Sequence, residues 1–169
     1  LEAWKQDQKH KPLILRGARQ VGKTTVVNEF GSQFDNYLYF NLERNENAKL
    51  FEMEIPLDDL VNMLYASVGK VKKEGTTLVF IDEIQNSPKT IALLRYFYEQ
   101  RPDLYVIAAG SLLENLVDVK VSFPVGRVQY LALRPCSFSE FLGAIGKNNL
   151  LAVLSQKAEY TVAFHEQLM

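Results

Sequence analysis

The chain has 169 residues, of which 47% are hydrophobic and 23% are charged, and its formal net charge at pH 7 is −1. This length and mixture predict one folded, soluble domain and exclude a disordered or fibrous chain. A net charge near zero gives no long-range attraction for nucleic acid, and no apolar run approaches the roughly 20 residues of a membrane span. We therefore expect a cytoplasmic protein with no strong nucleic-acid signal and no membrane segment.

Short apolar runs alternate along the chain with longer stretches of helical period, which is typical of a parallel sheet with crossover helices. Strands are expected at residues 12–16, 37–42, 76–81, 104–109 and 127–133. Helices are expected at residues 23–34, 48–53, 57–71 and 88–100, with a turn and short helix at 110–119. The unbroken apolar run of the third strand indicates that both of its faces are covered. The predicted fold class is α/β, a three-layer sandwich around a mostly parallel five-stranded sheet.

The C-terminal part of the chain is expected to be helical to its end. Ser137 is a plausible N-cap, and Glu140 three residues later completes a capping box. The predicted organisation is a core over residues 1–135 and a helical segment over residues 136–169 that begins a lid or linker. The sequence starts without methionine and stops inside an amphipathic stretch, which suggests an excised fragment. Cys136 is expected to be a buried small hydrophobe.

A phosphate-loop motif follows the first predicted strand. Residues 17–24 match the pattern G-x-x-x-x-G-K-[ST] at every specified position. A strand enters the loop and a helix leaves it, so unpaired N–H groups and the positive helix end face anionic phosphate. Lys23 is expected to contact the β- and γ-phosphates of ATP, and the Thr24 hydroxyl to coordinate Mg²⁺. The alternative is a glycine turn before an ordinary helix. The expected nucleotide-binding residues are Gly17, Ala18, Arg19, Gln20, Val21, Gly22, Lys23, Thr24 and Thr25.

The third strand runs into two acids, Asp82 and Glu83. Asp82 is expected to hold Mg²⁺ through water, opposite Thr24. Glu83 can orient and deprotonate water for attack on the γ-phosphate, a role that a hydrolase needs and a simple nucleotide carrier does not. The alternative is a pair of strand-end acids that cap the next turn. Gln85 can also reach the water or the phosphate, although a solvated loop residue is the simpler interpretation.

Other polar residues are weaker candidates. Ser111 follows the fourth strand, where it can N-cap a helix with Glu114 three residues on. Arg127 precedes the last strand and can stabilise transition-state charge on the γ-phosphate of its own or a neighbouring subunit, the alternative being a surface arginine. Arg19 can contact phosphate, but a salt bridge or solvent exposure is the simpler interpretation. The predicted catalytic residues are Glu83, Lys23, Ser111 and Arg127, and the predicted metal ligands are Thr24 and Asp82.

The sequence resembles the AAA-superfamily ATP-binding proteins of bacteria and archaea that carry a C-terminal domain of unknown function. The resemblance covers nearly the whole chain. It rests on residues 17–25 (GARQVGKTT), 78–85 (LVFIDEIQ), 109–111 (AGS), and 126–127 (GR) followed by 133–141 (LRPCSFSEF). The loop and acid motifs occur in many ATPases, whereas the G-R pair and the P-x-S-F-x-E-F run narrow the resemblance to this group.

The resemblance implies a sheet in the order 5-1-4-3-2. It implies that Ser111, after the strand between the loop strand and the acid strand, hydrogen-bonds the attacking water or the phosphate, as in phosphate-loop ATPases with an extra catalytic glutamate. It also implies that adenine is the base, that Arg127 matters, and that such proteins continue well beyond the equivalent of Met169. The helical lid and the accessory domain would then be largely missing.

The function predicted from these residues is ATP binding and Mg²⁺-dependent hydrolysis, coupled to conformational change in attached domains, a protein partner or a homo-oligomer. A regulatory switch that binds ATP and ADP with little turnover is the first alternative. A small-molecule kinase is less favoured, because the stretch after Ser111 is short and carries few candidates for mobile arginines. A nucleic-acid motor is disfavoured by the lack of a basic, aromatic-rich stripe.

Overall fold

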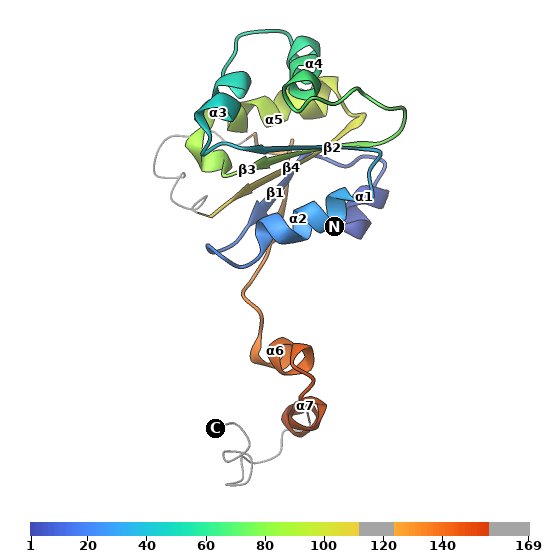
Figure 1. Cartoon of the computed structure of the whole chain (residues 1–169), viewed down its shortest axis with the longest axis vertical. Helices are drawn as coiled ribbons and strands as arrows, with labels where there is room; N and C mark the ends of the chain where they lie inside the picture. The colour runs from blue at the N-terminus through green and yellow to red at the C-terminus, as the bar shows by residue number, and fades with distance from the viewer. Residues whose placement is uncertain (112–123, 156–169) are drawn as a thin grey trace. The chain divides into compact units, whose positions relative to one another are not determined.

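The computed structural model describes residues 1–111 and 124–155, and the chain divides into two units, Leu1–Arg134 and Pro135–Met169. In the first unit a sheet lies between two helical layers (Figure 1). One face of the sheet is covered by α1 (Glu2–Gln6) and α2 (Lys23–Gly31). The other face is covered by α3 (Asn45–Phe51), α4 (Leu57–Ser67) and α5 (Pro88–Gln100). The predicted three-layer α/β sandwich is confirmed.

The sheet has five strands, and every pair of neighbouring strands is parallel. They are β1 (Leu13–Arg16), β2 (Asn36–Asn41), β3 (Thr77–Asp82), β4 (Leu104–Gly110) and β5 (Gln129–Ala132). Their order is β2-β3-β4-β1-β5, so the expected order 5-1-4-3-2 is confirmed. Arg16 lies opposite Gly110, and Asn41 lies opposite Asp82. Because the strands are parallel, their carboxyl ends meet at one edge of the sheet, where ligands bind in open α/β folds.

The inner strand β3, which lies between β2 and β4, is buried along its whole length. Leu78 and Phe80 pack in the apolar layer on the α2 side, and Val79 and Ile81 pack in the layer on the α5 side. All four are fully buried. This arrangement explains why the sequence here shows no alternation of apolar and polar residues: a strand with helices on both faces needs apolar side chains at every position.

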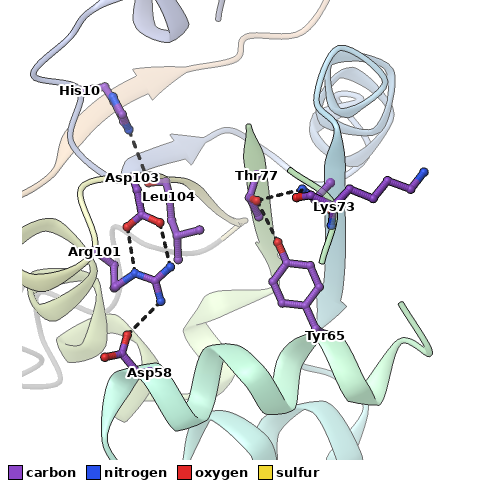
Figure 2. A network of polar contacts seen from close by, with 9 residues as sticks. His10, Asp58, Tyr65, Lys73, Thr77, Arg101, Asp103 and Leu104 are labelled. Atoms are coloured by element: carbon purple, nitrogen blue, oxygen red, sulfur yellow. Dashed lines mark hydrogen bonds and ion pairs between the residues drawn. The ribbon is translucent and has the colours of Figure 1, made fainter. Parts of the chain in front are cut away.

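Polar contacts hold the helices on the α5 side to the amino edge of the sheet (Figure 2). The Tyr65 hydroxyl of α4 shares a hydrogen bond of 2.8 Å with the Thr77 hydroxyl at the start of β3. The Arg101 guanidinium, just past α5, donates two hydrogen bonds to the Asp103 carboxylate, of 2.9 and 2.8 Å, and one of 3.0 Å to Asp58 of α4. These contacts lie at the end of the strands opposite the loop.

The second unit contains α6 (Phe138–Ala144) and α7 (Asn148–Ser155). The predicted capping box is confirmed: the Ser137 hydroxyl accepts a bond from the Glu140 amide, and the Glu140 carboxylate accepts one from the Ser137 amide. The expectation of unbroken helix is wrong within the described residues. Gly146 has φ of 75°, a left-handed conformation that ends α6 before α7 begins. The expected helix beyond residue 155 lies outside the described residues.

Some predicted helix boundaries differ from the structure. The helix expected over residues 57–71 ends at Ser67, because Gly69 takes a left-handed φ of 64° that closes the helix end. The helix expected over residues 23–34 ends at Gly31, where a Cβ would lie 2.7 Å from the Tyr37 ring of the next strand. The short α1 was not predicted, and the helix expected over residues 110–119 lies, from residue 112, outside the described residues.

Cys136 is exposed, so the expectation that it is a buried hydrophobe is wrong. Its neighbours Phe138 and Phe141 are also about half exposed, at 48% and 49%, so the described residues do not place an apolar core around it. Within residues 1–111 and 124–155, no helix combines the length and the apolar composition that a bilayer crossing requires.

Candidate functional site

The loop of residues 17–22 joins the end of β1 to the start of α2. Gly22 is the N-cap of α2 and has φ of 91°, a left-handed conformation that favours glycine. Gly17 lies against the end of β5, where a Cβ would come 2.4 Å from the carbonyl oxygen of Leu133. The first glycine is therefore required by space and the second by backbone conformation. Together they allow the loop to curve around the N–H groups at the start of α2, the arrangement that binds phosphate.

Lys23 begins α2 and is 7% exposed. Its Nζ donates hydrogen bonds of 2.9 Å to the carbonyl oxygen of Gly17 and 2.8 Å to that of Ala18. A buried ammonium group needs such partners, because an unpaired buried charge is costly. The side chain therefore lies inside the curve of the loop, where the β- and γ-phosphates of a nucleotide are contacted in phosphate-loop proteins.

Asp82 ends β3 and lies within hydrogen-bond distance of the helix that follows the loop. The residue is 3% exposed, and its Oδ2 accepts a hydrogen bond of 2.7 Å from the Thr24 hydroxyl. Its Oδ1 accepts one of 3.0 Å from the main-chain N–H of Glu83. The structure thus brings together the two predicted metal ligands, which are 58 residues apart in the sequence.

The donor atoms of Thr24 and Asp82 fit Mg²⁺, which prefers hard oxygen ligands. Within the described ranges, no group of three or more His, Cys, Asp or Glu side chains could hold a metal ion. Mg²⁺ is commonly held by one or two carboxylates together with the phosphates of its nucleotide, rather than by a cage of protein ligands. The residues present fit an ion that binds together with a nucleotide.

Tyr39 of β2 contacts Asp82, and its position in the sequence did not predict this contact. Its hydroxyl donates a hydrogen bond of 3.4 Å to Asp82 Oδ2, the oxygen that also accepts from Thr24. Burial, and then the negative charge of Asp82, raise the pKa of Tyr39 above its ordinary value of 10, so the hydroxyl stays protonated. Its ring packs against Phe80, opposite it in the register of the two strands. The only sequence signal was an aromatic residue in the middle of a strand.

Glu83 follows Asp82 in a left-handed conformation with φ of 54°. Non-glycine residues hold such a conformation at a cost of about 1–3 kcal/mol, and they cluster at functional sites. The Glu83 carboxylate accepts a short hydrogen bond from the Nε2 of Gln85. Gln85 is therefore not a freely solvated loop residue, which was the simpler interpretation of its sequence position.

An open pocket of about 460 Å³ lies over the loop, within the range of roughly 300–1,000 Å³ that is usual for small-molecule sites. Arg19 and Glu43 both line this pocket and form an ion pair of 3.8 Å, with side chains 72% and 54% exposed. The ion pair agrees with the simpler interpretation of Arg19, and its contact with phosphate stays a prediction. The pocket contains most of the predicted loop residues and the predicted base: it is lined by Arg19, Gln20, Gly22, Lys23, Thr24, Thr25, Glu43 and Glu83.

Ser111 follows β4, which lies between the loop strand β1 and the acid strand β3, as the family resemblance implied. Its Oγ is buried and has no hydrogen-bond partner among the described residues. A buried hydroxyl without a partner is uncommon in a native structure and calls for an explanation. The alternative role, an N-cap for residues 112–116, lies outside the described residues.

Arg127 does not lie near the loop. It precedes β5 and therefore sits at the amino edge of the parallel sheet, whereas the loop is at the carboxyl edge. Its Nε lies 3.2 Å from a carboxylate oxygen of Glu99, near the end of α5, and its side chain is 46% exposed. The expectation that Arg127 acts on the γ-phosphate of its own chain does not hold, because the parallel strands put the two groups at opposite edges. Action on a neighbouring subunit stays a prediction.

A glycine loop around a buried lysine, a helix that leaves it, and a strand-end acid facing the first turn of that helix define a P-loop nucleotide-binding domain. The chain belongs to the AAA domain family, whose model matches residues 9–142. It is an ATP-binding domain of the AAA superfamily, as the sequence resemblance predicted. The search of curated proteins found no match.

Two solved structures illustrate the similarity of fold. The Walker-type ATPase of Pyrococcus abyssi is 19% identical, with a TM-score of 0.52, and the match covers 89% of this chain and 57% of that one. A chain in the structure of Drosophila ORC bound to DNA is 14% identical, with a TM-score of 0.54, and the match covers 89% of this chain and 44% of that one. At these identities the likeness concerns the fold alone. This chain spans about half the length of the two similar chains.

Proposed function

We propose that this domain binds ATP with Mg²⁺ and hydrolyses the bond between the β- and γ-phosphates. The observation that carries the proposal is the hydrogen bond of 2.7 Å between Thr24 and Asp82, which joins the phosphate loop to the acid strand. A strand-end acid that only capped the next turn would have no need to contact the first turn of the loop helix. The contact supports a shared role in holding a hydrated cation next to the nucleotide.

Each residue of the site has a defined task in this proposal. Lys23 binds the β- and γ-phosphates, and Thr24 and Asp82 hold Mg²⁺, which supplies charge neutralisation on the phosphate oxygens when bound. Glu83 takes a proton from the attacking water as the water oxygen forms a bond to the γ-phosphorus. The bond from that phosphorus to the bridging oxygen breaks, and its electron pair stays on ADP. Ser111 donates a hydrogen bond to the γ-phosphate from the end of β4.

In this proposal, hydrolysis drives movement of attached domains or partners. Contacts made with the γ-phosphate exist with ATP and are lost with ADP, so turnover can drive conformational change in attached domains or partners. In this proposal residues 1–135 form the nucleotide-binding core, and the helical segment that follows begins a lid or linker. Arg127, exposed at the amino edge, would act on the nucleotide of a neighbouring subunit in a homo-oligomer. We place this activity in the cytoplasm.

The decisive experiment compares wild type with Glu83→Gln, measuring ATP binding by calorimetry and phosphate release with Mg²⁺. The amide keeps the shape of the carboxylate but cannot accept a proton, so binding should survive while turnover falls about 100-fold or more. Glu43→Gln is the matched control, because Glu43 lines the same pocket but pairs with Arg19 at the rim. Binding by the wild type without any turnover would instead establish the regulatory switch.

A further inference from the structure

Gln85 lies two residues after the proposed base Glu83, and the oxygen and nitrogen of its carboxamide have different surroundings. Its Nε2 donates a short hydrogen bond to Oε2 of Glu83. Its Oε1 is buried and has no hydrogen-bond partner among the described residues. The assignment of the two atoms follows from chemistry, because an ionised carboxylate can only accept and so requires the NH₂ group on its side.

The turn that carries Gln85 is fixed at both ends. Residues Ile84–Asn86 form the 3₁₀ helix η1, which Glu83 enters in its left-handed conformation. Ile84 is fully buried in the core, and the main-chain N–H of Asn86 donates a hydrogen bond of 3.0 Å to the Glu83 carbonyl oxygen. Ser87, also fully buried, then caps the start of α5. This anchoring holds the carboxamide in place at the carboxyl edge of the sheet, where η1 contacts β4.

A buried acceptor without a donor normally destabilises a protein. Such a group is retained where it has a partner in the working state of the molecule, and the missing partner here must be a hydrogen-bond donor. Water is a donor with two hydrogens, and the attacking water of a hydrolysis reaction needs to be held by two acceptors so that a lone pair faces phosphorus. The Glu83 carboxylate is one acceptor. Oε1 of Gln85 is held close to it, because the Nε2 of the same carboxamide is hydrogen-bonded to Glu83.

We propose that Gln85 is a further catalytic residue, whose Oε1 accepts one hydrogen bond from the attacking water while its Nε2 holds the Glu83 carboxylate that accepts the other. The proposal rests on the proposed hydrolysis and adds a residue to it. In the reaction the water oxygen bonds to the γ-phosphorus, one water proton moves to Glu83, and the bridging oxygen leaves with ADP. Gln85 keeps both of its N–H hydrogens and changes neither charge nor bonding.

The test is Gln85→Leu, which removes both hydrogen-bonding atoms at similar volume. We expect kcat to fall about 10- to 100-fold, as for other lost polar contacts to a reacting group, with ATP affinity and KM within about twofold of wild type. Because the substitution also removes a buried acceptor that lacks a partner, the thermal midpoint should be unchanged or raised. If Gln85 had only a structural role, the substitution would lower the thermal midpoint. Asn86→Ala, an exposed position on the same turn, should leave kcat unchanged.

A double variant strengthens the test. If both side chains hold one water, Gln85→Leu should cost little in the Glu83→Gln background, because residues that act as a unit are not additive. Full kcat in Gln85→Leu overturns the inference and leaves the proposed hydrolysis standing. A fall in the thermal midpoint together with loss of ATP binding also overturns the inference, because it would assign Gln85 a structural role. Absence of turnover in the wild type overturns hydrolysis and this inference together.

Discussion

The Thr24 hydroxyl and the Asp82 carboxylate are joined by a hydrogen bond of 2.7 Å, and the Tyr39 hydroxyl reaches the same carboxylate oxygen from 3.4 Å. The acid is thereby held from two sides, by the helix after the loop and by the neighbouring strand. An ion that takes the Thr24 oxygen as a ligand leaves Tyr39 as the remaining side-chain donor to that carboxylate oxygen among the described contacts. The aromatic residue thus gains importance when a cation binds.

Tyr39→Phe should weaken the response of turnover to Mg²⁺. Loss of one hydrogen bond to a charged group at this long distance is worth about 0.5–1.5 kcal/mol, so the Mg²⁺ concentration for half-maximal rate should rise roughly 2- to 10-fold. ATP binding measured in EDTA should not change. Tyr37→Phe is the control, since Tyr37 lies on the same strand and its hydroxyl bonds to Asn28. An equal effect in both variants would assign the change to the strand rather than to Asp82.

Lys23→Ala should lower ATP affinity about 100-fold or more, because charge-assisted hydrogen bonds to the phosphates are lost and the described pocket offers no other cation in that position. Titration calorimetry gives the affinity. Lys70→Ala is a suitable comparison: Lys70 also donates to a main-chain carbonyl, that of Tyr37 at 2.7 Å, but away from the pocket. Unchanged affinity in Lys23→Ala would place the nucleotide elsewhere.

Arg127→Ala should leave ATP binding intact and lower turnover only where subunits associate. Mixing Arg127→Ala with Glu83→Gln should restore part of the activity, since the second protein supplies the arginine and the first the base. Arg95→Ala is the matched control, because Arg95 pairs with the same carboxylate of Glu99, at 2.9 Å. Full turnover by Arg127→Ala at all protein concentrations would leave the arginine with a surface ion pair alone, worth less than about 1 kcal/mol.

Gly17→Ala tests the close approach of the loop to β5. Its Cβ would meet the Leu133 carbonyl oxygen at 2.4 Å, and main chain cannot move aside cheaply, so the free energy of unfolding should fall by about 1–3 kcal/mol. Gly143→Ala in α6 is the contrasting change, because no atom lies within 4 Å of its Cβ position and alanine favours a helix. Thermal melts of both variants measure the difference. Equal midpoints would show that the loop can shift away.

The ion pair of Arg101 and Asp103 should make stability depend on pH in the acid range. The hydrogen bonds from Arg101 lower the pKa of Asp103 below its ordinary value of 3.8. The stabilisation is therefore complete above pH 3.8 and is lost as the pH falls through the lower value of the folded protein. Denaturant unfolding of wild type and Asp103→Asn should differ by a constant amount near neutrality and converge in acid. If the difference in the free energy of unfolding between the two proteins stayed constant down to pH 2, the ion pair of Arg101 and Asp103 would not be its cause.

Much of the site was predictable because phosphate chemistry requires particular residues at consecutive positions. Lys23, Thr24 and Asp82 follow from local patterns, and the strand order followed from the family resemblance rather than from spacing. Tyr39 was not predictable in the same way: its contact depends on the pairing of β2 with β3, which sets it opposite Phe80 and one strand from Asp82. A register between strands is a property of the folded sheet and leaves no mark on either segment alone.

The position of Arg127 in the fold was also not predictable from its local sequence. A residue that precedes a strand can be placed at an edge of the sheet only when the direction of that strand is known, and its partner Glu99 lies 28 residues earlier in the chain. Gln85 was visible in the sequence, but a polar residue after an acid is usually solvated. The buried Ile84 beside it, which anchors the turn, is what distinguishes it from an ordinary loop residue.

The contact between Gly17 and Leu133 also has a mechanical meaning. The Leu133 amide donates a bond of 2.7 Å to Arg16, the residue before the loop, and the chain passes into its second unit after Arg134. Any shift of the loop backbone must push on Leu133 or part from it. In the proposed hydrolysis, a movement of the loop would therefore reach the residues before the second unit through one close approach, that of Gly17 to the Leu133 carbonyl.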